Sequence, residues 1–211
     1  MTQRFVIRLL PLEVLLMSLA AASMIVVDAH WADAAVRPAP APVAASGLPA
    51  LFTPEVQYWA GKISTWAADA KLDPALVATV MQIESCGNPG AVSSAGAEGL
   101  FQVMPYHFAA GDDMLDPDTN AQRGLAYLAL ALARSGGNPG LALAGYNGGL
   151  SLIGLDSSLW PSETKSYRYW GSGIYADAGQ GQGSSPRLQA WLQAGGAGMC
   201  ARAATALGLG R

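Results

Sequence analysis

Apolar residues recur at helical spacing through most of the chain from about residue 53 onward. Thr53 and Pro54 form a helix start, and the apolar residues behind them predict a first helix that ends near Lys71. Asp73, also followed by proline, starts a second helix that Gly87 terminates. Two helices joined by a short connection are therefore expected at the start of the domain.

Helical patterns continue after one irregular segment. Residues 87–99 are rich in Gly, Ser, Asn and Pro, which predicts an ordered loop or a short hairpin. A long helix should follow with Asp118 or Thr119 as its cap, and further helices should begin at Pro139 and near Pro161. Two short helices after a glycine-rich hinge complete a mostly α-helical fold, with almost no signal for strands.

Composition divides the chain into four parts. Residues 1–35 have two arginines, an apolar run and an A-x-A pattern, which predict a signal peptide; an uncleaved N-terminal membrane anchor is the alternative. Residues 36–52 are a Pro/Ala-rich linker. We expect the main domain over residues 53–178 and a C-terminal helical extension over residues 179–211. We predict that the protein is exported and lies outside the cell or in the cell envelope.

Glu84 falls in the last turn of the second predicted helix. A helix C-terminus carries partial negative charge, so the ionised carboxylate is disfavoured there. Val77, Met81 and Glu84 follow the i, i+4, i+7 pattern, which turns the carboxyl group toward the core or a cleft. Burial and the helix end both raise the pKa of Glu84, so we predict a protonated acid near neutral pH.

Charge and histidine content exclude several function classes. The net charge is −3 with 12 Lys and Arg and no basic stripe, so nucleic acid is not an expected partner. His30 and His107 stand alone, which gives no metal cluster with useful spacing. The glycines lack the context of a phosphate-binding loop. We therefore expect no cofactor and no metal, and we expect a monomer.

The chain has two cysteines, Cys86 and Cys200. In an oxidising compartment they can form a disulfide, whereas two separate free thiols are the alternative. Predicted export favours the disulfide. It would tie the C-terminal extension to the residues that follow Glu84.

Several sequence blocks occur together in one order. They are Glu84-Ser85, GNPGAVSSAGAEGLFQVMP, NAQRGLAYL, ALAGYNGG and ETKSY, spread over roughly residues 75–170. In this order they resemble the lysozyme-like soluble lytic transglycosylases of the bacterial cell wall. The resemblance implies a lysozyme-like helical domain that acts on peptidoglycan. It also implies cleavage of the β-1,4 bond between N-acetylmuramic acid and N-acetylglucosamine, which leaves a 1,6-anhydro end.

The resemblance implies a single catalytic residue, Glu84. Most glycosidases use two carboxylates, but in this family the C6 hydroxyl of the sugar attacks the anomeric carbon. One residue can then act first as acid and next as base. Glu98 is the nearest other carboxylate, and we interpret it as solvated surface because glycine flanks it. The aspartates of residues 112–118 fit a loop and a helix cap.

Substrate-binding roles follow from the resemblance where the motifs match. Ser85 matches a serine that forms a hydrogen bond near the active site, and its alternative is a helix-end residue facing water. Gln102 matches a glutamine that contacts sugar, and its alternative is an exposed polar residue. Gly99 would let the backbone approach the ligand. Phe101 stands where the family usually has methionine, which affects pocket shape more than reaction type.

Four further residues resemble parts of a substrate cleft. Met104 and Tyr146 match cleft-wall residues, and we predict that the Tyr146 hydroxyl bonds Glu84 or the sugar. Asn147 should hold the YNGG turn, and Tyr167 fits the cleft edge. Ordinary core packing or turn chemistry is the alternative for each of the four.

Two other functions remain open at this stage. A lysozyme-type muramidase would need a second carboxylate across the cleft from Glu84. A non-catalytic peptidoglycan-binding module would bind glycan strands without turnover. The expected partner is peptidoglycan in each case, with membrane association if the N-terminal segment is not cleaved.

Overall fold

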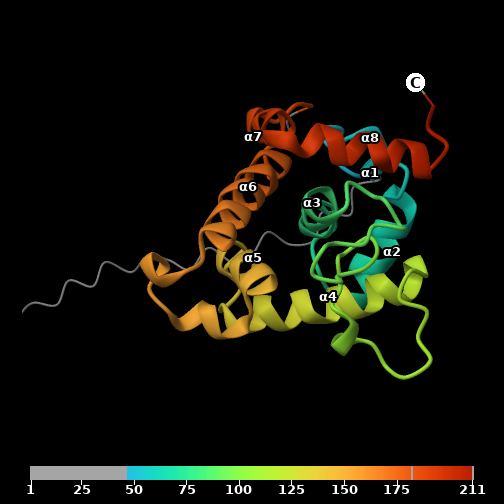
Figure 1. The fold of residues 1–211 in the computed structure, drawn as a ribbon. Coiled ribbons are helices and arrows are strands. Elements are labelled where there is room, and N and C mark those ends of the chain that lie inside the picture. Colours follow the sequence, from blue (N-terminus) through green and yellow to red (C-terminus); the bar gives the residue numbers. More distant parts are fainter. Residues whose placement is uncertain (1–46, 182, 211) are drawn as a thin grey trace, which may run out of the picture. The chain divides into compact units, whose positions relative to one another are not determined.

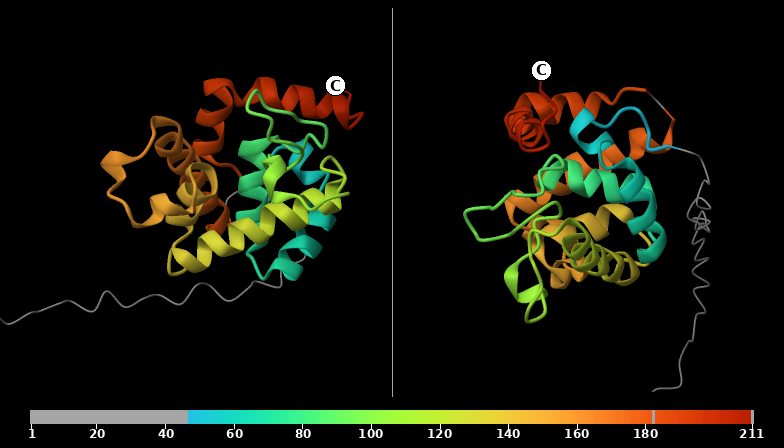
Figure 2. Two further views of the ribbon diagram at one scale, coloured as in Figure 1. Left: turned by 60° about the horizontal axis from the view of Figure 1, so that its bottom comes forward. Right: turned by 90° about the vertical axis from the view of Figure 1, so that its right-hand side faces the viewer.

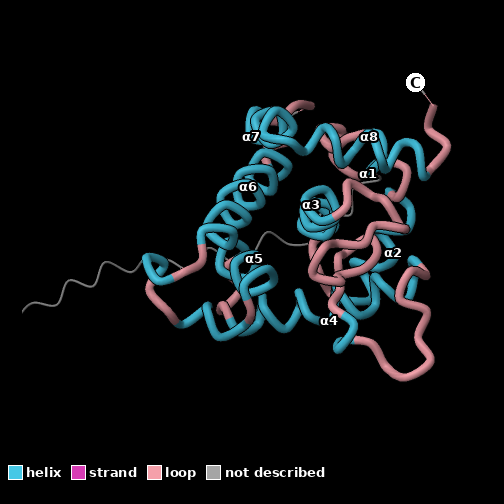
Figure 3. Tube along the Cα trace, in the orientation of Figure 1, coloured by secondary structure: helices cyan, strands magenta, loops and turns pink. Residues whose placement is uncertain are grey.

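Helices form nearly all of the regular structure in the described residues. The computed structural model describes residues 47–181 and 183–210, so the predicted signal and most of the linker lie outside the described residues. The mostly α-helical prediction is confirmed (Figures 1 and 3). The α-helices are α1 Pro54–Gln57, α2 Ala60–Ala70, α3 Pro74–Glu84, α4 Pro117–Arg134, α5 Pro139–Gly148, α6 Ser162–Gly179, α7 Pro186–Trp191 and α8 Ala197–Ala206. None of the helices in the described residues is long and apolar enough to cross a membrane.

The first predicted helix and the cap of α4 differ from the prediction, although the first helix begins at Pro54 as expected. The first predicted helix is divided into α1 and α2, because the chain leaves helical geometry at Trp59. The cap of α4 is Asp116 rather than Asp118 or Thr119, since the Asp116 carboxylate accepts a hydrogen bond from the backbone N–H of Thr119 at 2.8 Å. Asp118 instead forms an exposed ion pair with Lys62.

Helix α3 is the most enclosed helix near the predicted site. All of its residues from Ala75 to Gln82 are buried, including Val77 and Met81. It packs against α2 and α6, and in Figure 1 it is seen nearly end-on between them. A helix that is apolar on all sides is stable only inside a protein. The end of α3, and with it Glu84, is therefore fixed by the core.

The segment after α3 is a looped hairpin rather than a sheet. Isolated antiparallel bridges join Val92 to Glu98 and Glu98 to Val103. The green loops in Figure 1 show this segment between α3 and α4. The prediction of an ordered loop or short hairpin is thus confirmed, and LFQVMP forms its return branch.

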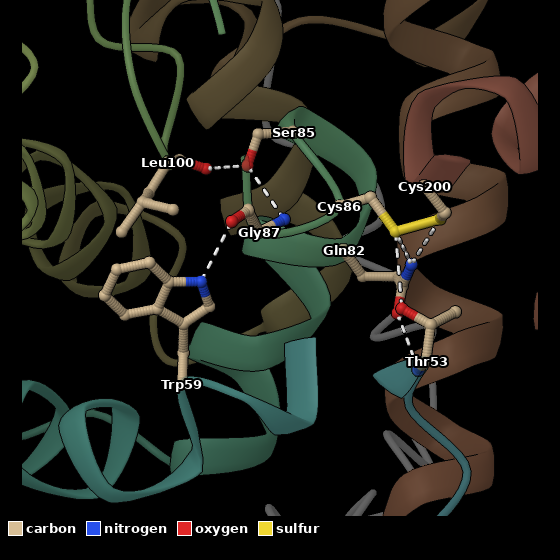
Figure 4. The surroundings of a disulfide bond; sticks show 8 residues. All are labelled: Thr53, Trp59, Gln82, Ser85, Cys86, Gly87, Leu100 and Cys200. Atoms are coloured by element: carbon tan, nitrogen blue, oxygen red, sulfur yellow. Dashed lines mark hydrogen bonds between the residues drawn. A yellow bond between two sulfur atoms is a disulfide. The ribbon is translucent and has the colours of Figure 1, made fainter. Parts of the chain in front are cut away.

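The C-terminal helices fold back over the start of the domain. Helices α7 and α8 are joined by a π-helical turn, η4 (Leu192–Gly196), in which Gly195 has a left-handed φ of 124°. Helix α8 contacts α1, and the further views in Figure 2 agree with this placement. The predicted disulfide between Cys86 and Cys200 is present, and it links α8 to the turn after α3 (Figure 4).

The disulfide should contribute strongly to stability. It closes a loop with a sequence separation of 114 residues, for which chain entropy predicts about 4–5 kcal/mol and measured losses run at about 2–5 kcal/mol. We expect the double variant Cys86→Ala with Cys200→Ala to lose about 2–5 kcal/mol in free energy of unfolding. Urea unfolding of the two proteins measures the difference. Equal stability of variant and oxidised wild type would contradict the prediction.

Candidate active site

Glu84 is the last residue of α3, and its environment favours the protonated carboxyl group. The residue keeps part of its surface exposed, while the helix end that carries it is packed into the core. Burial and, to a smaller extent, the nearby charge of Glu163 raise the pKa of Glu84 from 4.5 to about 8. A hydrogen bond from Tyr167 acts in the opposite direction and lowers the pKa. The carboxyl group is therefore mainly protonated at neutral pH.

Tyr167 holds the carboxyl group of Glu84. Its hydroxyl donates a hydrogen bond of 2.7 Å to Glu84 Oε1. Tyr167 lies on α6, which packs against α3, and its side chain is only 6% exposed. Burial and the neighbouring Glu84 raise the pKa of Tyr167 well above its ordinary value, so the hydroxyl keeps its proton. A donor that cannot ionise fixes the orientation of Glu84.

Tyr146 was expected to bond Glu84 or the sugar, and the structure gives its hydroxyl another partner. The hydroxyl donates to the backbone carbonyl of Phe101 at 2.7 Å. Burial and the charge of Glu84 both raise the pKa of Tyr146, so the ring still lies near the acid. The difference arises because α5 presents Tyr146 to the hairpin, whereas α6 presents Tyr167 to the end of α3.

Ser85 fixes the turn behind the acid. Its side chain is fully buried, which excludes the alternative of a residue facing water. The hydroxyl donates to the carbonyl of Leu100 at 2.7 Å and accepts from the N–H of Gly87 at 3.1 Å (Figure 4). Trp59 also donates from its indole N–H to the carbonyl of Gly87. Ser85 thus joins the end of α3 to the hairpin.

Gly99 packs against a buried side chain, and its expected approach to ligand stays a prediction. Its φ is +74°, and an added Cβ would lie 2.3 Å from the side-chain nitrogen of Asn120. Asn120 is fully buried, donates to the carbonyls of Glu98 and Met114, and accepts from the N–H of Phe101. The space beside Gly99 is therefore filled by Asn120. Sequence reasoning missed Asn120, although it is the first residue of the NAQRGLAYL block.

Gln102 is held by backbone groups at the turn of the hairpin. It has a left-handed φ of 46°, and its side-chain nitrogen donates to the carbonyls of Ala91 and Gly99 at 3.1 and 3.0 Å. The residue is partly exposed, as is Met104 farther along the same branch. These contacts give Gln102 a fixed orientation.

Asn147 connects two helices. Its side-chain oxygen accepts a hydrogen bond of 2.8 Å from the Thr164 hydroxyl, which ties the end of α5 to the start of α6. Because α6 carries Tyr167, this bond also supports the position of the Glu84 partner.

The other carboxylates considered for the site lie in different environments. Glu98 is partly buried and belongs to the hairpin through its backbone, so it is less solvated than expected. Asp112 forms an ion pair with Arg123 at 2.7 Å. Glu163 was not considered from the sequence, yet its charge acts on Glu84. Its position one helical turn before Tyr167 in ETKSY is the signal that could have revealed it.

Part of the chain is similar to known proteins. Residues 62–159 match the model of the Transglycosylase SLT domain. Over these residues the chain is similar to the transglycosylase SLT domain. This SLT domain match includes Glu84, the hairpin and Tyr146, and it ends before Tyr167 and Cys200. It supports the predicted lysozyme-like class of fold for the matched residues.

Individual relatives match parts of the chain. The transglycosylase of Enterobacteria phage PRD1 is 39% identical over 114 residues, covering 53% of this chain and 40% of that protein. Membrane-bound lytic murein transglycosylase E of Buchnera aphidicola is 31% identical over 86 residues, covering 35% of this chain and 39% of that protein. The structure of lytic transglycosylase Slt from Pseudomonas aeruginosa matches with a TM-score of 0.48 and 21% identity, over 60% of this chain and 25% of that one. The chain thus spans about two fifths of the length of these two curated relatives.

The raised pKa of Glu84 predicts how stability depends on pH. Between pH 4.5 and about 8 the folded chain holds a proton that the unfolded chain has released, so Glu84 makes the folded state less stable as pH rises through this window. Glu84→Gln removes this loss. At pH values above 8 we expect the free energy of unfolding of the variant to exceed that of wild type by about 1–3 kcal/mol, a figure reduced because Glu84 is partly exposed. At pH 4.5 or below the two proteins should have nearly equal free energies of unfolding.

Urea unfolding of both proteins across this pH range measures the difference. Asp69→Asn is a matched control, because Asp69 is an exposed carboxylate on α2. A stability difference between Glu84→Gln and wild type that stays constant with pH would contradict the prediction.

Proposed function

We propose that this protein is a peptidoglycan lytic transglycosylase in which Glu84 is the single acid and base. The observation that carries the proposal is the hydrogen bond from Tyr167 to the Glu84 carboxyl group, which lies at the end of a buried helix where burial raises its pKa, within residues similar to the SLT domain. The names of the relatives, a transglycosylase and a membrane-bound lytic murein transglycosylase, support the same activity. The substrate would be the glycan strand of peptidoglycan.

The proposed reaction uses one carboxyl group twice. Glu84 donates its proton to the glycosidic oxygen as the bond from the anomeric carbon of N-acetylmuramic acid breaks, and N-acetylglucosamine leaves as an alcohol. The C6 hydroxyl of the same muramic acid then attacks its anomeric carbon. Glu84, now ionised, takes the proton of that hydroxyl. The product is a 1,6-anhydromuramic end, and Glu84 is protonated again without consumption of water.

The environment of Glu84 fits both steps. A pKa of about 8 keeps the proton in place at neutral pH until the leaving oxygen needs it. Burial then makes the carboxylate a stronger base than a carboxylate in water. The hydrogen bond from Tyr167 stabilises the ionised form during the reaction, so the proton can still be released.

Glu163 favours a second candidate function, a muramidase that uses water. Its charge acts on Glu84, and it is exposed in the first turn of α6. A hydrolase needs a second carboxylate for the attacking water or the intermediate. The two reactions differ by one water molecule in the product.

The predicted site residues have different parts in this proposal. Gln102, Met104 and the Tyr146 ring would face bound sugar, because all three are partly exposed and the charge of Glu84 acts on Tyr146. Ser85, Gly99 and Asn147 would act by positioning these groups.

We further propose that the chain works in the cell envelope as a monomer. The predicted N-terminal segment would export it or anchor it, and the membrane-bound relative supports this location.

The products of peptidoglycan digestion test the proposed reaction. We expect wild type to release muropeptides with 1,6-anhydro ends, seen by mass spectrometry as fragments one water lighter than hydrolytic fragments. Glu84→Gln keeps the shape of the side chain but has no titrating proton, so release should fall at least about 100-fold. Reducing ends alone would favour the muramidase, and glycan binding without any release would favour a binding module.

Loss of the Tyr167 hydroxyl should move the pH profile. The hydrogen bond lowers the pKa of Glu84, so Tyr167→Phe raises that pKa above its value of about 8. The basic limb of kcat should then shift upward by about one pH unit, while kcat itself decreases because Glu84 is less well oriented. Tyr146→Phe is the matched control, since that hydroxyl bonds Phe101 instead. A basic limb that stays at the wild-type pH in Tyr167→Phe would show that the bond does not act on the catalytic acid.

A further inference from the structure

A buried carboxyl group lies beside the disulfide. Glu55 is on α1 and is only 2% exposed, and its Oε2 atom has no hydrogen-bond partner among the described residues. Leaving a buried polar atom unpaired costs about 1–3 kcal/mol. A disulfide offers no hydrogen to such an oxygen. The position of Glu55 is therefore unexplained by the oxidised protein.

Three groups that bind metal ions converge at this point. A carboxylate oxygen of Glu55 and the Sγ atoms of Cys86 and Cys200 all lie within 4.8 Å of one another. They come from α1, from the turn after α3 and from α8, so the tertiary fold brings them together. Two thiolates and a carboxylate form a donor set that suits Zn²⁺.

The polar neighbours of the sulfur atoms would support thiolates. The side-chain nitrogen of Gln82 lies 3.0 Å from Cys86 Sγ and 3.5 Å from Cys200 Sγ, and it points its N–H groups toward both (Figure 4). The Gln82 oxygen accepts from the N–H of Thr53, which fixes the orientation of the amide. Donors aimed at a thiolate favour its charged form, and such outer contacts orient metal ligands.

Space and access are available next to the cluster. A cavity of about 920 Å³ is lined by Glu55 and Cys200, together with apolar residues of α7 and α8 such as Leu188 and Leu192. Ligands of a tetrahedral zinc ion lie roughly 3.5–3.8 Å apart, from zinc bonds of about 2.3 Å to sulfur and about 2.0–2.2 Å to oxygen. Side-chain shifts of about 1 Å would bring the Glu55 oxygen into that range, and the two sulfur atoms would move apart to it once their bond is reduced. The cavity can supply a water molecule as the fourth ligand.

We propose that Glu55, Cys86 and Cys200 form a zinc site when the disulfide is reduced. A dithiol or a phosphine supplies two electrons, and with two protons the S–S bond becomes two thiols. Zn²⁺ then binds both sulfurs and the Glu55 carboxylate, and the two thiol protons are released to solvent. The complex has a local charge of −1, because the three ligands contribute −3 and the ion contributes +2.

The proposed site would preserve the link made by the disulfide. In either state α8 is joined to the turn two residues after Glu84. A chain that has not yet met an oxidising compartment could therefore hold its C-terminal helices through the metal. This inference concerns binding alone and holds whether or not the proposed activity is correct.

Cobalt binding to the full chain tests the site. The protein is reduced with a phosphine, desalted without oxygen and titrated with Co²⁺, while thiolate-to-cobalt charge-transfer absorption is recorded. We expect one Co²⁺ per reduced chain, displaced by Zn²⁺, and no such absorption in the oxidised protein. Glu55→Gln should weaken binding at least as much as the roughly 10- to 100-fold loss caused by removing an outer-shell partner. Asp69→Asn, which alters an exposed carboxylate on α2, should bind like wild type.

Circular dichroism covers the case in which reduction unfolds the chain. If the reduced chain loses helix, the metal should restore the helical signal, because binding and folding are then coupled. The inference is overturned if the folded, reduced chain gives no thiolate–cobalt absorption. It is also overturned if Glu55→Gln binds like wild type, or if an unfolded reduced chain gains no helix with metal.

Discussion

The position of Glu84 depends on the burial of the helix that carries it. Helix α3 is enclosed along almost its whole length, so its C-terminal residue cannot move without disturbing the core. The same burial makes ionisation of Glu84 costly and raises its pKa to about 8. One packing arrangement therefore supplies both the location and the protonation state of the proposed acid. Glu84 ionises only at a cost in stability, which is common for groups kept for function.

The turn after α3 connects this helix to the rest of the domain. Within three residues, Ser85 bonds the hairpin, Cys86 bonds α8, and Gly87 leaves room for the backbone of α1. The added Cβ at Gly87 would lie 2.8 Å from the carbonyl oxygen of Glu55, so a larger residue there would push α1 away. The proposed catalytic acid is thus followed directly in the sequence by the residues that hold the surrounding elements together. The C-terminal helices, which lie beyond the matched SLT domain, are tied directly to its proposed active site.

Several features of the site were predictable because they depend on local sequence. The end of α3 at Glu84 follows from the helix pattern and the glycine behind it, and the hairpin follows from its glycine-rich composition. The cap of α4 was misplaced, because four aspartates lie within residues 112–118 and only geometry decides which one meets a free N–H. The contact between Gly99 and Asn120 was also not predicted, since the two residues are distant in the sequence.

By itself, the sequence determined the helical class, the place of Glu84 at a helix end and the two cysteines available for pairing. These follow from apolar periodicity, helix caps and composition, which act over a few residues. Only the tertiary structure decided that Tyr167 rather than Tyr146 donates to Glu84, that Glu163 acts on it, and that Glu55 lies beside the disulfide. The reason is physical: each of these contacts joins different elements, and the packing angle between two helices decides which of several similar side chains meet.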